Sequence, residues 1–331
     1  MNSQFKKVRD LIDQNSKIIL TTHVVPDGDA IGSVIAFSEY LKLKGKSPVI
    51  INHSKTPHNL EFLDRNSEIR IFSENEYENS RLIEDAELIF ILDTNEFSRT
   101  KSMEPFIKKS EAGKICIDHH TGIKPESFTA VISNVDYPSN CSILYDYMMD
   151  DNEALISQEV ASALYVGIMT DTGSFRYPRT DENVFIVCAD LIRKGADPVS
   201  LYENIYATTT MDNLKLAARF IESLEFYDNQ KVVVGTVTRK DFEELNLNID
   251  HVEGFSSMIM NIKGVQLGVI LVELKDNIKI SFRSKGDIKV NELAIEYNGG
   301  GHKNAAGANV KDKSLQDLKV SILKKINKYL D

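Results

Sequence analysis

Residues 18–33 read IILTTHVVPDGDAIGS. The first three residues are apolar, and they are followed by a polar turn that contains His23, Asp27 and Asp29. After the turn, apolar residues recur at helical spacing through 31–44. Strand, turn and helix in this order form the unit from which parallel α/β sheets are built. The stretch therefore predicts an α/β protein with three potential ligands at the end of a strand.

Two further apolar runs end in polar residues in the same way. Residues 88–92 (LIFIL) end in Asp93, and residues 115–117 (ICI) end in the triplet DHH at 118–120. Continuous apolar runs of this length predict parallel strands that are buried on both faces. Open α/β sheets bind their ligands beyond the carboxyl ends of the strands. We therefore expect the three polar clusters to converge on one edge of the sheet.

The chain is expected to form two domains, because 331 residues exceed one ordinary core. Strand and helix patterns alternate to about residue 195, a helical pattern at 201–224 follows, and the remainder is predicted to be smaller and α+β. The expected limits are 1–195 for the first domain, 196–225 for a helical linker and 226–331 for the second domain.

Composition limits the class of protein. The net charge of −10 argues against a protein that holds long nucleic acid on a basic surface. The three cysteines lack the spacing of a metal site or a CxxC motif, so they are expected to be reduced and buried. Neither a signal-peptide pattern nor an apolar run of membrane-spanning length is found. These features predict a cytoplasmic protein.

Taken singly, the polar clusters leave alternatives open. Imidazole and carboxylates in one turn suit Mn²⁺, Mg²⁺, Fe²⁺ or Zn²⁺, but Asp27 or Asp29 equally suits a cap for a helix that starts near Ala30. A lone Asp93 is more often a turn or cap residue than a ligand. Two adjacent histidines at 119–120 favour chemistry, because they cannot both point into one apolar core.

Two more clusters lie further along the chain. Asp171 falls in a Thr- and Gly-rich turn after an apolar helix, which taken alone is a helix exit. Residues 299–302 are GGGH. One glycine is enough to close a helix near Asn298, whereas three glycines followed by a histidine suggest close approach of the backbone to an anion.

Together, H-x3-D-x-D at 23–29, Asp93, DHH at 118–120, Asp171 and GGGH at 299–302 resemble the motif series of the DHH phosphoesterase superfamily. The chain is identified as similar to its two-domain, NrnA-like group of oligoribonucleases and pAp phosphatases. The resemblance covers nearly the whole chain, and the order and approximate spacing of all five motifs match. It implies an N-terminal parallel-sheet DHH domain and a smaller α+β DHH-associated domain, with the active-site cleft between them.

The resemblance also implies two divalent metal ions, most often Mn²⁺, with Mg²⁺ or Fe²⁺ as alternatives. The implied ligand sets are His23, Asp27 and Asp93 for one ion, and Asp29, Asp93, His119 and Asp171 for the other. The implied catalytic residues are Asp93, which both ions share, and His120, which contacts the phosphate. Asp118 is expected to orient the histidines.

The second domain is expected to grip the substrate through Arg283, Gly300, Gly301 and His302. By resemblance, the protein hydrolyses very short RNA to mononucleotides and also dephosphorylates pAp. The alternatives are a phosphodiesterase for pApA or cyclic di-AMP, and a non-catalytic nucleotide-binding protein. The expected partners are short single-stranded RNA or small nucleotides, without long duplexes or membranes, and relatives in the family are often homodimers.

Overall fold

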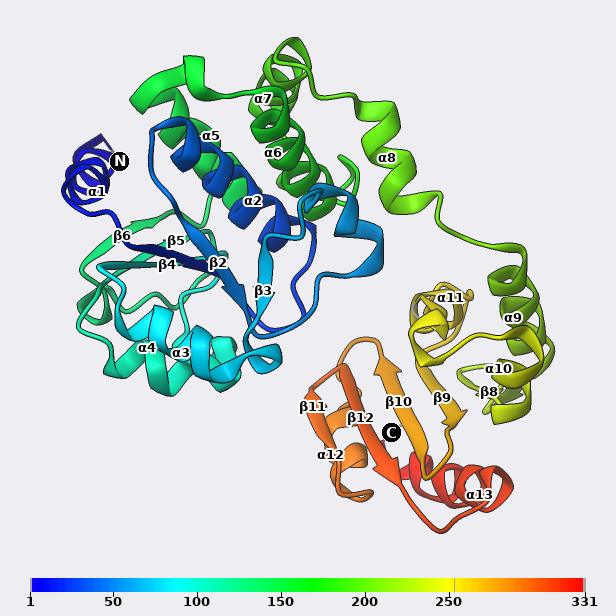
Figure 1. The fold of residues 1–331 in the computed structure, drawn as a ribbon. Coiled ribbons are helices and arrows are strands. Elements are labelled where there is room, and N and C mark those ends of the chain that lie inside the picture. Colours follow the sequence, from blue (N-terminus) through cyan, green and yellow to red (C-terminus); the bar gives the residue numbers. More distant parts are fainter. Residues whose placement is uncertain (1, 253, 330–331) are drawn as a thin grey trace. The chain divides into compact units, whose positions relative to one another are not determined.

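A computed structural model describes residues 2–252 and 254–329. The chain splits into two compact units, Met1–Thr208 and Thr209–Asp331, which are described one at a time (Figure 1). Helices occupy most of the segment that was expected to be a linker, and the exact limits of the domains stay a prediction. No helix among the described residues is long and apolar enough to cross a membrane.

A parallel sheet forms the centre of the first unit. Its six strands lie in the order β3-β2-β1-β4-β5-β6, and every neighbouring pair is parallel. The chain reverses its direction of winding between β1 and β4, and such a switch point is where doubly wound sheets bind ligands. The strands are β1 Ile18–Thr21, β2 Val49–Asn52, β3 Ile69–Ile71, β4 Leu88–Leu92, β5 Gly113–Asp118 and β6 Ala130–Ser133.

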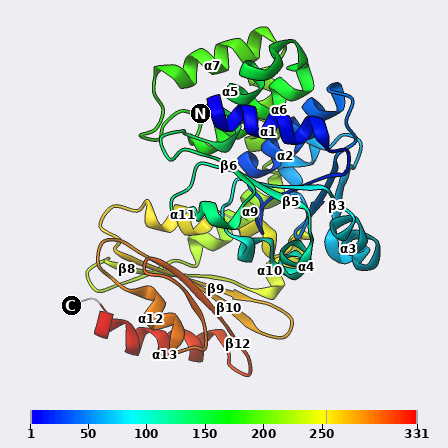
Figure 2. The same ribbon diagram turned by 90° about the vertical axis from the view of Figure 1, so that its left-hand side faces the viewer.

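Helices cover both faces of this sheet (Figure 2). In β4, Leu88, Phe90 and Leu92 pack on one side of the sheet, while Ile89 and Ile91 pack on the other. Burial on both faces explains why the strand is apolar at every position, and the expected α/β parallel fold is confirmed. The first face carries α1 Asn2–Gln14, α2 Gly28–Leu43, α5 Asn140–Asn152, α6 Gln158–Asp171, α7 Glu182–Arg193 and α8 Pro198–Tyr206; the second carries α3 Glu76–Glu84 and α4 Glu104–Lys109.

Glycines let α2 and α6 approach closely. A Cβ atom on Gly32 would lie 2.6 Å from the carbonyl oxygen of Ala163. A Cβ atom on Gly167 would lie 2.2 Å from Cys141 Sγ and 2.7 Å from Asp29 Oδ1. Only glycine fits at these two positions, and the close packing brings α6 against the first turn of α2.

The second unit contains a mixed sheet in the order β11-β12-β10-β9-β8-β7. Only β8 and β9 form a parallel pair among its neighbouring described strands. One face is covered by α9 Met211–Glu222, α10 Arg239–Leu245 and α11 Phe255–Met260, and the other by α12 Val290–Ile295 and α13 Leu315–Ile326. The strands are β7 Glu225–Tyr227, β8 Val232–Val237, β9 Leu267–Glu273, β10 Ile278–Ser284, β11 Gly300–His302 and β12 Ala305–Val310.

Three local expectations were wrong. The helix expected to start near Ala30 begins at Gly28, so Asp29 lies in its first turn. Asp171 is the last residue of α6 and not part of the turn that follows. The connector at 201–224 consists of two helices, because residues 207–210 (ATTT) separate α8 from α9.

Candidate metal centre and substrate pocket

Polar side chains gather at the switch point of the first sheet. His23 follows β1 by two residues, and Asp93 follows β4 directly. His23 Nε2 lies 3.4 Å from Asp93 Oδ2 and 3.9 Å from Asp27 Oδ2. Asp93 has a φ of 59°, and a non-glycine residue in this left-handed region is uncommon and often marks a functional constraint. These three residues form the first group of potential ligands.

A second group adjoins the first through Asp93. His119 Nε2 lies 3.4 Å from Asp93 Oδ1, 3.5 Å from Asp171 Oδ2 and 3.8 Å from Asp29 Oδ2. The potential ligand atoms of Asp29, His119 and Asp171 lie within 4.8 Å of one another. The fold therefore brings together all six side chains that were expected to be ligands. A third group of this kind, Asp93, His119 and His120, overlaps the other two.

Backbone carbonyls orient the two buried imidazoles. His23 Nδ1 lies 2.9 Å from the carbonyl oxygen of Val24, and His119 Nδ1 lies 3.2 Å from that of Tyr137. A carbonyl can only accept a hydrogen bond, so Nδ1 carries the proton in each ring. The lone pair of Nε2 then faces the carboxylates, which is the arrangement that metal-binding histidines adopt.

Asp27 serves as a helix cap and also faces the cluster. Its Oδ1 accepts hydrogen bonds of 3.1 Å from the backbone N–H groups of Asp29 and Ala30, which makes it the N-cap of α2. Its Oδ2 is the atom that faces His23. The cap and ligand interpretations of this turn are therefore compatible, because each uses a different oxygen of the same side chain.

The start of α5 fixes the carboxylate of Asp29. The backbone N–H of Asn140 donates to Asp29 Oδ2 over 2.6 Å, and that of Cys141 donates to Oδ1 over 2.9 Å. These are the first two residues of α5, where the N–H groups lack partners within the helix. Both oxygens of the buried carboxylate are thus held in place by the backbone.

The cluster crowds buried carboxylates together, and their pKa values reflect it. Burial and the charges of Asp93 and Asp171 raise the pKa of Asp29 well above its usual range. Burial, with Asp93 and Asp27 nearby, raises the pKa of Asp171 to about 6 although His119 opposes the shift. Repulsion of this kind is what a bound cation removes.

Asp93 differs from the other carboxylates in this respect. Burial acts to raise its pKa, but the neighbouring imidazoles of His119 and His23 outweigh burial and lower it. Burial acts to lower the pKa of His119, but the carboxylates of Asp93, Asp29 and Asp171 outweigh it and raise this pKa to about 9. Asp93 Oδ1 is buried and has no hydrogen-bond partner by geometry. An orphaned buried oxygen beside imidazole and carboxylate donors fits hard divalent ions, which bind such donors.

His120 lies at the edge of the cluster in a hydrogen-bonded chain. Its Nδ1 is 2.8 Å from Asp118 Oδ1, and Asp118 Oδ2 accepts a 2.6 Å hydrogen bond from Asn95 Nδ2. The His120 side chain is 46% exposed, so its Nε2 edge is accessible to a ligand. Sequence reasoning missed Asn95, although its place two residues after Asp93 was a signal that could have identified it.

The second unit has a cavity of about 490 Å³ beside β10 and β12. Arg283 and Gly300 line it, whereas Gly301 and His302 lie on the exposed strand β11 without lining it. Sequence reasoning missed Lys279, Asn298 and Asn309, which give the cavity further polar groups; its lining residues are Lys279, Ile280, Ser281, Arg283, Asn298, Gly299, Gly300, Ala305, Ala306, Gly307, Ala308 and Asn309.

The glycines of this loop are required for two different reasons. A Cβ atom on Gly299 would lie 2.1 Å from the carbonyl oxygen of Gly307, so the two backbones touch. Gly301 has a φ of 142°, which strains other residues. A Cβ atom on Gly300 would meet nothing within 4 Å. Packing thus explains Gly299, while Gly300 leaves open space over the cavity.

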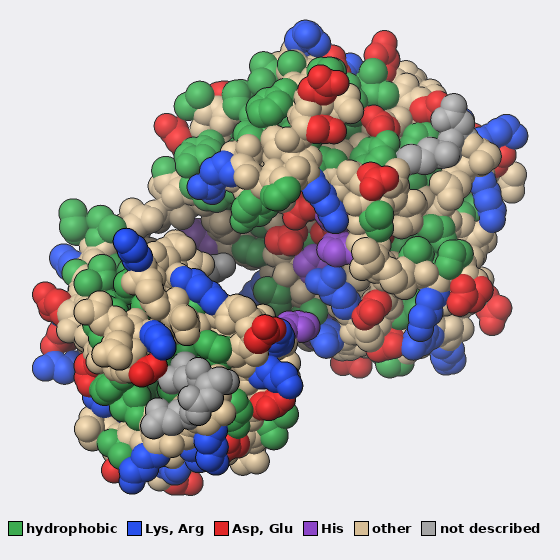
Figure 3. Space-filling model, turned by 180° about the vertical axis from the view of Figure 1, so that it is seen from behind, with side chains coloured by type: hydrophobic (Ala, Val, Ile, Leu, Met, Phe, Trp, Pro, Cys, Tyr) green, Lys and Arg blue, Asp and Glu red, His purple; other side chains and the backbone are tan. Residues whose placement is uncertain are grey.

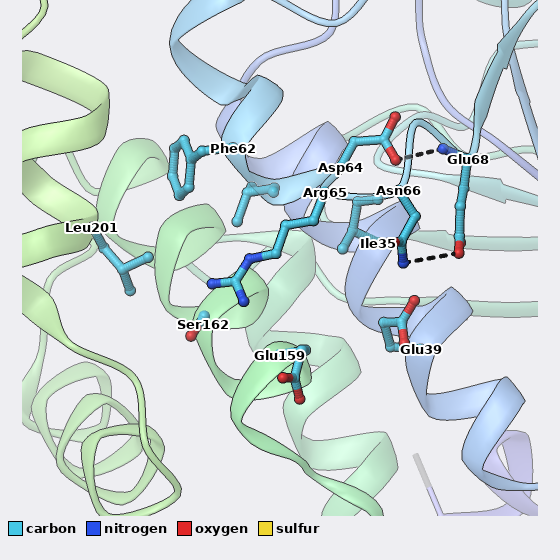
Figure 4. Close-up of a pocket in the computed structure, with 11 residues that line it drawn as sticks. Ile35, Glu39, Phe62, Asp64, Arg65, Asn66, Glu68, Glu159, Ser162 and Leu201 are labelled. Carbon is cyan, nitrogen blue, oxygen red and sulfur yellow. Dashed lines mark hydrogen bonds between the residues drawn. The ribbon is translucent and has the colours of Figure 1, made fainter.

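A smaller cavity of about 90 Å³ lies in the first unit between α2, α6 and α8 (Figure 4). The side chain of Arg65 extends across it toward Ser162 and Glu159, and Phe62 and Leu201 form an apolar side. None of the clustered Asp and His residues lines this cavity, so it is separate from the candidate metal centre.

A doubly wound sheet with a His and Asp cluster at its switch point is the arrangement that the motif series predicts for a phosphoesterase of the DHH class. The DHH family, N-terminal domain, matches residues 17–168, and the DHHA1 domain matches residues 229–331. The chain therefore belongs to the DHH family, in the form that carries a DHHA1 domain.

Known proteins resemble the chain over most of its length. It is 27% identical to the bifunctional oligoribonuclease and PAP phosphatase NrnA of Bacillus subtilis, over 91% of this chain and 93% of that protein. It is 24% identical to the cyclic-di-AMP phosphodiesterase PdeA of Listeria monocytogenes, over 97% of this chain but 49% of that protein. A crystal structure of an exopolyphosphatase-related protein from Bacteroides fragilis has a TM-score of 0.86 at 28% identity, covering 98% of this chain and 97% of that one.

Proposed function

We propose that this protein is a metal-dependent phosphodiesterase that hydrolyses very short RNA to mononucleotides and removes the 3′-phosphate of pAp. The observation that carries the proposal is the double cluster of His and Asp side chains around Asp93. The similarity to NrnA, which spans both units, supports the choice of substrates.

In this proposal, His23, Asp27 and Asp93 hold one divalent ion, and Asp29, Asp93, His119 and Asp171 hold a second. Ions in such a site lower the pKa of bound water and neutralise charge on phosphate oxygens. Mn²⁺ is the expected ion, with Mg²⁺ or Fe²⁺ as alternatives. The cap on Asp27 and the backbone bonds to Asp29 keep the carboxylates in place before any ion arrives.

His120 is the residue proposed to act on the phosphate. Asp118 accepts a hydrogen bond from its Nδ1, which fixes the orientation of the ring. Its exposed Nε2 can then donate a hydrogen bond to a phosphate oxygen and pass a proton to the leaving oxygen. Asn95 keeps Asp118 in position from the opposite side.

The cavity of the second unit is proposed to bind the rest of the substrate. Arg283 offers a planar set of donors that suits a phosphate, and the open space above Gly300 admits a ligand close to the backbone. On the face shown in Figure 3, Lys and Arg side chains are interspersed with Asp and Glu, without a continuous basic band. This distribution supports short substrates over long duplexes.

The proposal includes a cytoplasmic location and a homodimer. All three cysteines are free and buried, as is typical of proteins in a reducing compartment. The homodimer is proposed because relatives in the family are often homodimers. Measuring the mass of the protein in solution tests it.

A signalling dinucleotide, pApA or cyclic di-AMP, is the second candidate substrate. The match to PdeA covers both units of this chain, which favours this candidate over a non-catalytic role. The expected metal ligands are all present and close together, so a protein that only binds nucleotides is the weakest alternative.

The decisive experiment compares substrates under one condition. The purified full chain with Mn²⁺ is given dinucleotide and trinucleotide RNA, pAp, pApA, cyclic di-AMP and a long single-stranded RNA. We expect the highest kcat/KM on the shortest RNA, measurable release of adenosine 5′-phosphate from pAp, and little cleavage of the long RNA. The proposal is wrong if dinucleotides and pAp stay intact while another phosphate ester is hydrolysed.

A further inference from the structure

The short helix after β4 holds an arginine beside the candidate metal centre. This 3₁₀ helix, η3 Phe97–Met103, is anchored by Thr100 and Met103, whose side chains are fully buried. In the same helix, the carbonyl oxygen of Arg99 accepts a 2.8 Å hydrogen bond from the backbone N–H of Val24. Arg99 is therefore fixed by its backbone next to the residue that follows His23.

The side chain of Arg99 is half-buried, yet it forms no hydrogen bond or ion pair with any residue that the structure describes. Arginines in partly buried places normally pair with a carboxylate, and this chain has 49 Asp and Glu residues. The residue whose backbone bonds Val24 thus carries a guanidinium whose donors no described residue engages.

The charge balance of the cluster indicates a role for the Arg99 guanidinium. The cluster contains four carboxylates, from Asp27, Asp29, Asp93 and Asp171, and two divalent ions would contribute about +4. The filled centre would then be close to neutral, while a phosphodiester brings one negative charge and gains more as it is attacked. A further cation near His23 favours that charge, and an arginine carries its charge at any working pH.

We propose that Arg99 binds a non-bridging oxygen of the substrate phosphate on the His23 side of the metal centre. The assignment rests on the proposed phosphodiesterase function and adds a residue to it that lies outside the five motifs. Arg99 supplies two parallel donors and fixed charge, whereas His120 approaches the phosphate from the side of β5. The backbone bond to Val24 is independent of the side chain, so substitutions isolate the guanidinium.

The test compares Arg99→Gln and Arg99→Lys with Lys101→Gln, a control that removes one exposed charge from the same helix. We expect Arg99→Gln to lower kcat/KM on dinucleotide RNA about 100-fold, Arg99→Lys to restore part of it, and the control to match the wild type. Competitive inhibition by inorganic phosphate should weaken in Arg99→Gln. Calorimetric binding of Mn²⁺ should be unchanged or tighter, because a positive charge beside His23 has been removed.

Two results would overturn the assignment. One is Arg99→Gln with wild-type kcat/KM and wild-type inhibition by phosphate. The other is a loss of Mn²⁺ binding in parallel with activity, which indicates that Arg99 only supports the structure. If the wild-type protein hydrolyses none of the nucleotides but binds Mn²⁺, the proposed function has failed. If the protein cleaves another phosphate ester, Arg99 is still tested by comparing how strongly inorganic phosphate inhibits that hydrolysis in the wild type and in Arg99→Gln.

Discussion

The cluster of the first unit and the cavity of the second differ in what holds them in place. Around Asp93, buried ionisable side chains are oriented by backbone groups, such as the carbonyl of Val24 and the N–H of Asn140. Around Gly300, the surface is open and formed largely by backbone and small residues, with Arg283 as one of its charged groups. The side chains proposed for chemistry are thus held by backbone hydrogen bonds, whereas the residues proposed to bind the rest of the substrate leave room for a ligand.

The largest effect is expected from the residue that both groups of the cluster share. Asp93→Ala removes the only carboxylate among the described residues that faces both His23 and His119. We expect kcat/KM on dinucleotide RNA to fall by at least about 1,000-fold and Mn²⁺ binding measured by calorimetry to weaken. Asp136→Ala, which removes an exposed carboxylate of the same unit, is the matched control. Full activity in Asp93→Ala would remove the basis of the two-ion proposal.

The two neighbouring glycines of the cavity, Gly299 and Gly300, are expected to differ in what their substitution changes. Gly300→Val places a side chain in open space, so the protein should fold normally while the KM for dinucleotide RNA rises about tenfold or more. Gly299→Ala forces a Cβ atom against the carbonyl of Gly307 and should lower the melting temperature instead. Steady-state kinetics and thermal unfolding of both variants separate the effects. A normal KM in Gly300→Val means that the cavity does not hold the substrate.

A smaller effect is expected from the backbone that orients Asp29. Asn140→Pro removes the N–H that donates to Asp29 Oδ2 at the first position of α5, where proline is otherwise well tolerated. The Asn140 side chain also bonds Ser33, so Asn140→Ala is the control for its loss. We expect Mn²⁺ affinity to be about tenfold weaker in the proline variant than in the alanine variant. Equal affinities would show that this hydrogen bond does not tune the site.

The smallest effect on stability separates the two roles of Asp27. Serine is as good an N-cap as aspartate, so the free energy of unfolding of Asp27→Ser should equal that of the wild type. The free energy of unfolding of Asp27→Ala should be about 1 kcal/mol lower. Both variants should bind Mn²⁺ more weakly, because both lack the oxygen that faces His23. Chemical denaturation without metal and calorimetry with Mn²⁺ measure the two quantities. Equal loss of stability in both variants would contradict the capping role.

The sequence predicted the buried strands of the first unit well, because burial on both faces leaves an unbroken apolar run such as 88–92. It also located the polar ends of those strands, since the carboxyl edge of a parallel sheet follows from the order of elements. The strands β11 and β12 were missed because Gly and Ala carry little strand preference, and because the pairing of β12 with β10 joins residues more than 20 positions apart.

Within the site, contacts between distant residues were beyond sequence reasoning. The DHH triplet draws attention to Asp118, but its bond to Asn95 requires the ends of β4 and β5 to lie side by side. The anchoring of Asp29 by α5 joins residues 111 apart in the chain. Whether the six clustered side chains hold metal, and whether Arg283 grips a phosphate, stay predictions.

The cap on Asp27 has a consequence for how an ion enters and leaves. Because Oδ1 is already engaged with the amides of Asp29 and Ala30, the first turn of α2 does not need to order around an arriving ion. Amide hydrogen exchange at these two residues should therefore be slow in the presence of a chelator as well as with Mn²⁺. The ion would therefore bind to and leave a turn that is already ordered, without any local unfolding of the helix.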